Sequence, residues 1–91
     1  MEKYTCPCCG YKTLNDEHKY DICPICYWED DYSQFEDVDL EGGANNGISL
    51  RQAQKNFIEF GACEKGMSRY VRKADIYDVR DKNWKPLYEG I

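Results

Sequence analysis

Four cysteines near the N-terminus are spaced as metal ligands. Cys6 and Cys9 form one CxxC motif, Cys23 and Cys26 form a second, and 13 residues separate the two motifs. A CxxC turn places two sulfur atoms about 3.5–4 Å apart, which matches one edge of a tetrahedron around Zn²⁺. The sequence therefore predicts one zinc site with these four cysteines as its ligands.

The residues beside these cysteines favour the tight turns that such a site needs. Pro7 and Pro24 each follow the first cysteine of a motif and fix the backbone φ there. Gly10 follows the first motif and accepts a conformation that other residues avoid. Four thiolates leave no open position for water, so the predicted zinc is structural and contributes its binding free energy to folding.

Other ligands and another metal compete with this interpretation. Iron in a rubredoxin-type site also takes four thiolates, and Gly10 fits that pattern. However, Tyr27 rather than glycine follows the second motif, and the loop between the motifs is short. Zinc is therefore favoured over iron. Cys8 is expected to be a spare thiol near the metal, Cys63 a small core or surface residue, and His18 a turn residue that serves as a ligand only if one cysteine does not.

Length and composition are those of one small domain spanning residues 1–91. The N-terminus shows no apolar signal region, and no stretch approaches the roughly 20 apolar residues of a membrane span. We therefore expect a cytoplasmic protein without a membrane partner. In that compartment thiols stay reduced, and paired CxxC motifs indicate a metal rather than disulfides.

The elements that must position the cysteines predict an α+β fold with four segments. Residues 1–28 read as a zinc-ribbon-like β-hairpin, with strands in Thr5–Leu14 and Lys19–Ile25, and residues 29–47 as an acidic loop. An amphipathic helix over 48–62 has Ser49 as its N-cap, with Gln52 completing a capping box, and Gly61 at its end. Residues 63–91 are expected to form a basic strand and tail.

Three classes of function fit these features, of which a protein-interaction module ranks first. A nucleic-acid-binding zinc ribbon would use a basic patch around Tyr70, but residues 28–47 carry seven Asp/Glu and no Lys/Arg, which argues against nucleic acid. An enzyme would use the thiol of Cys8 or an acidic cluster, although solubility or ion pairing explains that cluster more simply. The patch is Lys65, Arg69, Arg72 and Lys73, and the acidic cluster is Glu29, Asp30 and Asp31.

The sequence also resembles the bacterial cysteine-rich CPCC family along nearly its whole length. The resemblance implies a short protein with a zinc-binding cysteine set and assigns no activity. The matching residues are Cys6-Pro7-Cys8-Cys9-Gly10-Tyr11, Tyr20 to Asp31, Gly42-Gly43-Ala44-Asn45, Ser49-Leu50, Asn56-Phe57, Phe60-Gly61-Ala62, Val71-Arg72-Lys73 and Asn83-Trp84-Lys85-Pro86-Leu87.

Overall fold

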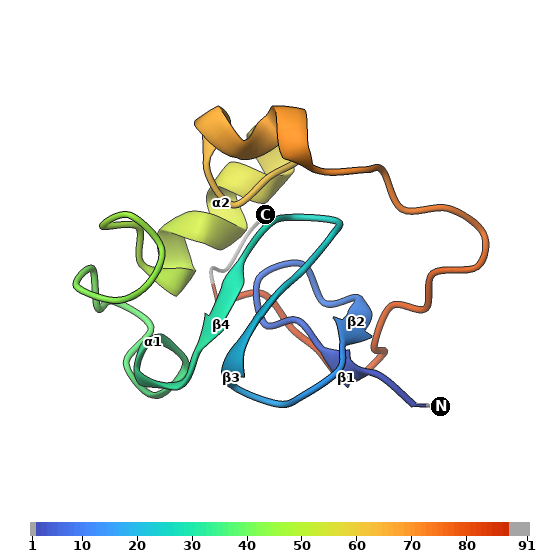
Figure 1. Cartoon of the computed structure of the whole chain (residues 1–91), viewed down its shortest axis with the longest axis horizontal. Helices are drawn as coiled ribbons and strands as arrows, with labels where there is room; N and C mark the ends of the chain where they lie inside the picture. The colour runs from blue at the N-terminus through green and yellow to red at the C-terminus, as the bar shows by residue number, and fades with distance from the viewer. Residues whose placement is uncertain (1, 88–91) are drawn as a thin grey trace.

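Two small β-hairpins and one main helix make up the computed structural model, which describes residues 2–87 (Figure 1). Strands β1 (Tyr4–Thr5) and β2 (Lys12–Leu14) pair antiparallel, and β3 (Lys19–Ile22) pairs antiparallel with β4 (Glu29–Asp31). The helices are α1 (Tyr32–Glu36), α2 (Leu50–Phe60) and the 3₁₀ helix η1 (Lys65–Tyr70). The predicted α+β, zinc-ribbon-like class is confirmed.

The strand pairing differs from the expected single hairpin. Each CxxC motif forms the turn of its own hairpin, so β1 and β2 flank the first motif and β3 and β4 flank the second. The strands that were expected to pair with each other, β2 and β3, belong to separate two-stranded sheets. Sequence pattern alone did not reveal this because strands of two to four residues carry almost no alternation signal.

The acidic segment is more ordered than the predicted loop over 29–47. Its first eight residues form β4 and α1, so the loop begins only after Glu36. Asp31 caps α1 by accepting a hydrogen bond from the Ser33 amide at 2.8 Å, and it also accepts from the Ala44 amide at 3.0 Å. Asp30 and Asp31 are buried, so their expected role as solvating or ion-pairing surface charge is wrong.

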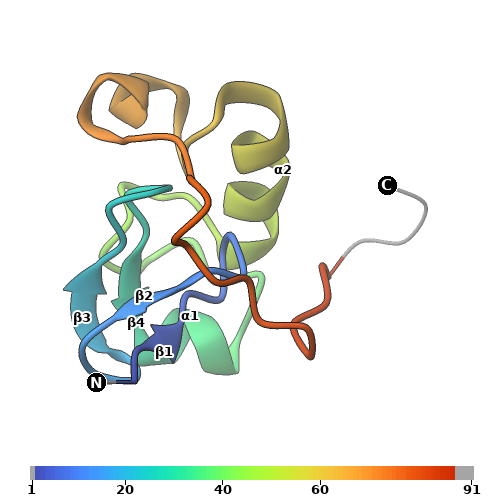
Figure 2. The ribbon, with the colours of Figure 1, turned by 90° about the vertical axis from the view of Figure 1, so that its right-hand side faces the viewer.

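Helix α2 forms where the sequence predicts it. The Ser49 hydroxyl accepts from the Gln52 amide at 3.1 Å, and Gly61 ends the helix with φ 76°. Only half of the expected capping box forms, because the Gln52 side chain donates to Asn56 instead. Figure 2 shows α2 standing beside the hairpins, with η1 across its end.

The last predicted segment, 63–91, contains no strand among its described residues 63–87. It begins with η1 and continues as an irregular chain that returns to the first hairpin, where Arg80 forms an isolated bridge with Tyr11. Trp84 and Leu87 pack on the domain, Leu87 beside the core and Trp84 against Gly10. No helix within residues 2–87 is long and apolar enough to cross a membrane.

Candidate metal centre

The four predicted ligands meet at one buried point. Cys6, Cys9, Cys23 and Cys26 are buried, and their sulfur atoms all lie within 4.8 Å of one another. Cys6 Sγ is 3.5 Å from Cys26 Sγ, and Cys9 Sγ is 3.8 Å from Cys23 Sγ. A tetrahedron with Zn–S bonds of about 2.3 Å has edges of about 3.8 Å, so the sulfur cluster fits a tetrahedral metal ion.

Each pair of cysteines sits on a turn of the same design, which we call a knuckle: residues 6–11 for the first and 23–28 for the second. In the first, Cys6 N donates to Tyr11 O at 2.9 Å, and Gly10 N donates to Cys6 O at 2.8 Å. In the second, Cys23 N donates to Trp28 O at 3.0 Å, and Tyr27 N donates to Cys23 O at 2.7 Å. Both knuckles therefore fix the two sulfurs they carry by matching backbone bonds.

The second knuckle closes although no glycine follows it. Tyr27 adopts φ 71°, close to the 82° of Gly10, in the left-handed region that favours glycine. The presence of Tyr27 therefore does not separate this site from a rubredoxin-type geometry, and the short loop between the two motifs remains as the sequence argument against iron.

Proton affinity within the cluster is uneven. Burial raises the pKa values of Cys6 and Cys26 well above the usual range. The pKa of Cys23 is lowered, because its sulfur accepts hydrogen bonds from the surrounding thiols, that of Cys26 first, and from Thr13. A bound divalent cation would displace the protons of these buried thiols, because cysteine binds metal as the thiolate.

Among the described residues 2–87, two donors outside the four-cysteine cluster reach one of its sulfur atoms, and both reach Cys23. The Thr13 hydroxyl donates to Cys23 Sγ at 3.0 Å, and the Ile25 amide donates to it at 3.4 Å. Such second contacts orient ligands and adjust their basicity. Thr13 could not be recognised from the sequence, since a lone threonine in a strand gives no sign that it faces a cysteine of the cluster.

The chain around the first knuckle converges on its carbonyl groups. Pro7 O accepts hydrogen bonds from Gln54 Nε2 and from Trp84 Nε1, both at 2.9 Å. Arg80 Nε donates to Cys9 O at 3.1 Å, and its guanidinium lies between the rings of Tyr11 and Trp84. Helix α2 and the C-terminal segment thereby lock this knuckle in place.

The remaining candidate thiols are not part of the cluster. Cys8 is buried beside the four clustered cysteines, and burial raises its pKa. Cys63 is buried too, with a pKa raised to about 12 by burial. Its amide donates to Cys26 O at 2.7 Å, so its backbone supports the second knuckle.

His18 and the acidic cluster serve the fold elsewhere. Asp30 accepts from the His18 backbone amide at 2.7 Å and lies 3.1 Å from His18 Nδ1, while the imidazole stacks on Phe35. His18 is therefore neither a metal ligand nor the exposed turn residue that was expected. Within residues 2–87 the four cysteines are the one group of His, Cys, Asp or Glu placed to hold a metal.

Three of the four cations in the predicted basic patch contact other side chains of the protein. Arg72 forms a bidentate pair with Asp78 at 2.7 and 2.9 Å, which raises the pKa of Arg72 and lowers that of Asp78 to about 2. Arg69 lies over the Tyr70 ring and Lys65 over the Phe60 ring. The patch therefore offers fewer free cations than its sequence suggests.

The fold and site define a small α+β protein built around a four-cysteine cluster that can bind a metal ion. The sequence profile of the cysteine-rich CPCC family matches residues 4–78, which include both knuckles. The chain therefore belongs to the cysteine-rich CPCC family. No curated protein matches it significantly in sequence.

Proposed function

We propose that this protein is a zinc-stabilised protein-interaction module, in which zinc holds the fold and the surface binds another protein. The burial of all four sulfurs in one cluster, with all of them within 4.8 Å of one another, carries this proposal. A site closed by four protein ligands has no position for substrate or water, which is the property of structural rather than catalytic zinc. The bound ion would supply no chemistry beyond holding the two knuckles together.

Metal analysis of the purified protein tests the zinc assignment. Protein prepared under reducing conditions without chelator is expected to contain one zinc per chain and little iron. Removing the zinc should abolish the dispersed amide NMR spectrum, and adding zinc back should restore it, because metal binding and folding are coupled. A well-folded protein without metal would overturn the proposal, and one iron per chain would replace zinc while keeping the site.

The surface supports an interaction role better than catalysis. Apolar and aromatic side chains remain exposed around the molecule, and tyrosine in particular is enriched at protein interfaces. The enzyme alternatives lack exposed groups, since Cys8, Asp30 and Asp31 are buried and both carboxylates accept hydrogen bonds within the fold. The exposed residues are Tyr4, Tyr20, Ile22, Tyr32, Phe35, Ile58, Tyr70, Ile76, Tyr77 and Val79.

Binding in a native lysate tests this role. Zinc-loaded protein should retain a partner that a Cys9→Ser variant, which lacks one ligand, does not retain. Equal retention by both proteins would show that the zinc-built surface is not what binds, and would overturn the interaction role.

One observation favours nucleic acid as a second candidate partner. Tyr27 and Tyr70 stack with ring centroids 5.5 Å apart, and Arg69 lies over the Tyr70 ring. Exposed aromatic rings beside a cation can stack on unpaired bases. The test is a titration with single-stranded DNA and RNA, where binding weakened by salt and by Tyr70→Ala would support this candidate. The absence of any spectral change would eliminate it.

A further inference from the structure

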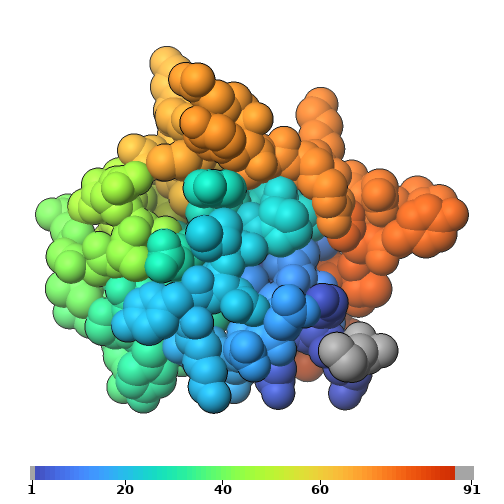
Figure 3. All heavy atoms as spheres, viewed as in Figure 1, coloured from blue at the N-terminus to red at the C-terminus, as the bar shows by residue number. Residues whose placement is uncertain are grey.

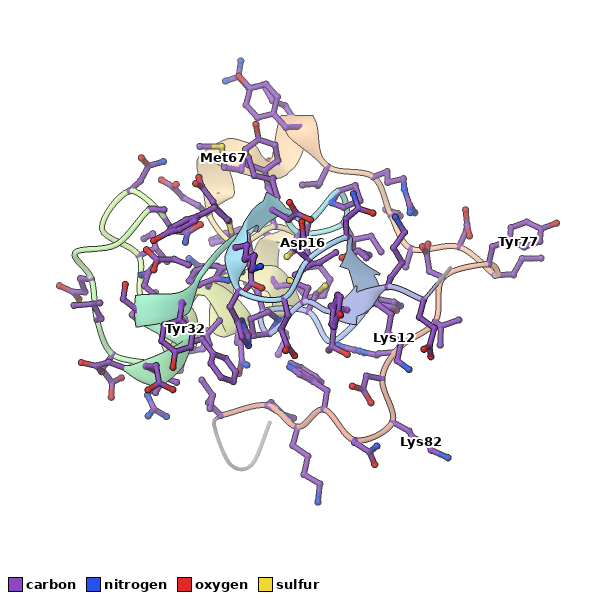
Figure 4. The ribbon with its side chains drawn as sticks, turned by 60° about the horizontal axis from the view of Figure 1, so that its bottom comes forward. Lys12, Asp16, Tyr32, Met67, Tyr77 and Lys82 are labelled. Carbon is purple, nitrogen blue, oxygen red and sulfur yellow. The ribbon has the colours of Figure 1, made fainter. Side chains whose placement is uncertain are left out.

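The loop after η1 holds two large apolar side chains away from the protein. Ile76 is 90% exposed and Tyr77 is 85% exposed. Figure 3 shows this part of the chain as a projection on the right-hand side of the molecule. In Figure 4 the Tyr77 side chain points outward, on the side opposite to Tyr32. We call residues 75–78 the tip.

Hydrogen bonds within the chain fix the shape of the tip. Asp75 N donates to Asp78 Oδ2 at 2.8 Å, Tyr77 N donates to Asp75 Oδ1 at 2.8 Å, and Asp78 N donates to Asp75 O at 3.1 Å. We call the preceding residues 71–74 the stem of the loop. The bidentate ion pair between Arg72 and Asp78 joins the tip to this stem. Because the loop is already ordered, burying its apolar side chains costs little conformational entropy.

An apolar groove opens beside the stem of the same loop. It has a volume of about 390 Å³ and is lined on one side by α2 and the second knuckle, and on the other by the stem. This volume falls within the range of roughly 300–1,000 Å³ typical of pockets that hold a small organic group. The residues that line the groove include Ile25, Phe57, Phe60, Val71 and Lys73.

The tip cannot fill this groove in its own chain, because its turn and the Arg72–Asp78 pair direct Ile76 and Tyr77 outward. A second copy of the chain can fill it. Tip and groove lie side by side, so a two-fold axis between them would place each tip in the other copy's groove, the reciprocal pattern of an isologous interface. The charges agree with this arrangement, since Asp75 on the tip would meet Lys73 on the groove wall of the other copy.

We propose that this protein forms a two-fold dimer in which the tip of each copy, with Ile76 and Tyr77, inserts into the groove of the other copy that Phe60 and Val71 help to line. The inference rests on the proposed interaction role and names its surface and occupant. The exchanged contacts are confined to one loop and one groove, so the interface is small. We therefore expect a reversible dimer with a dissociation constant on the order of micromolar to tens of micromolar.

Sedimentation velocity of the zinc-loaded protein, in reducing buffer from about 1 to 500 µM, is the primary test. The expected result is a concentration-dependent shift from monomer to dimer. An Ile76→Ser/Tyr77→Ser tip variant should stay monomeric, whereas Tyr32→Ser, which removes another half-exposed tyrosine (53%), should dimerise like the wild type. A monomeric wild-type protein, or a tip variant that still dimerises, would overturn the proposal.

A mixing experiment tests the reciprocal geometry. Phe60→Glu should block the groove without disturbing the core, since Phe60 lies outside the buried cluster and the residues packed on it. The Phe60→Glu variant keeps an intact tip, and the tip variant keeps an intact groove. Adding unlabelled Phe60→Glu protein to isotope-labelled tip variant should therefore shift the amide signals of groove residues 57–61 and 68–74. Adding unlabelled tip variant instead should shift none of these signals. Shifts in both cases, or in neither, would contradict the tip-in-groove contact.

Zinc content separates this inference from the proposed function. One zinc per chain in a protein that stays monomeric would remove the dimer and leave the zinc-built module intact. A folded protein without metal would remove the module itself.

Discussion

The two knuckles have the same backbone conformation but are packed against different neighbours. Both place the residue after the second cysteine at positive φ, 82° for Gly10 and 71° for Tyr27, and both close with the same pair of backbone hydrogen bonds. Trp84 covers the first knuckle at Gly10, whereas in the second Tyr27 itself packs against the core and stacks on Tyr70.

That difference explains which residue occupies each turn. A Cβ on Gly10 would lie 2.6 Å from ring atoms of Trp84, so a side chain cannot fit while the tryptophan is in place. At Tyr27 the left-handed backbone costs about 1–2 kcal/mol for a residue with a Cβ, and packing of the ring offsets part of this cost. Neighbouring packing, rather than the metal, therefore selects glycine at one knuckle and tyrosine at the other.

The largest expected effect comes from removing one ligand from either knuckle. Cys9→Ser and Cys26→Ser should each lower zinc affinity by more than about 100-fold, since a four-ligand zinc site with 10–16 kcal/mol of binding free energy derives roughly 3 kcal/mol from each ligand. Competition with a chromophoric chelator measures the loss. The control is Cys8→Ala, which should keep one zinc per chain. Equal zinc loss in this control would mean that Cys8 belongs to the ligand set.

Gly10→Ala should produce the next largest effect. We expect a loss of about 2–3 kcal/mol in unfolding free energy, from left-handed strain and from displacing the Trp84 indole that donates to Pro7 O. Denaturant unfolding at fixed free zinc measures it. Gly61→Ala is the matched control, because Gly61 has φ 76° but no atom within 4 Å of an added Cβ. Similar losses at both glycines would show that Trp84 does not constrain the knuckle.

Thr13→Val should weaken zinc binding about 10-fold, the lower end for removing a hydrogen bond to a metal ligand. Thr13 supports only the second knuckle, through its 3.0 Å bond to Cys23 Sγ. Thr5→Val provides the control, since the Thr5 hydroxyl bonds Asp81 at 2.6 Å and no sulfur. If both variants lose zinc affinity equally, the effect belongs to the hairpin and not to the Thr13–Cys23 bond.

Residue spacing was enough to predict the four-cysteine cluster and the main helix. The CxxC motifs and the Ser49 and Gly61 caps are local signals, and each is read within a few residues. The structure brings the four predicted ligands together and begins α2 directly after Ser49.

The parts that the sequence did not reveal depend on contacts between distant residues. Pro7 O accepts hydrogen bonds from the side chains of Gln54 and Trp84, which lie 47 and 77 residues away in the sequence. Asp30 looked like a surface charge because its partner His18 lies across a hairpin whose strands are too short to recognise. Local pattern cannot encode such partners, since burial of a polar residue is decided by the whole fold.

The smallest expected effect concerns the tyrosine that occupies a glycine position. Tyr27→Gly removes left-handed strain of about 1–2 kcal/mol but also loses the Tyr70 stack, worth about 0.5–1.5 kcal/mol, and its packing against the core, so stability should change by no more than about 1.5 kcal/mol. Tyr27→Ala loses the same contacts and keeps the strain, so it should be less stable than Tyr27→Gly by about 1–2 kcal/mol. Unfolding at fixed free zinc measures both. The difference in unfolding free energy between the alanine and glycine proteins at position 27 reports the left-handed strain alone. The same difference at position 10 contains that strain plus the clash with Trp84. If the two differences are equal, Trp84 adds nothing and the knuckles do not differ in the way their packing indicates.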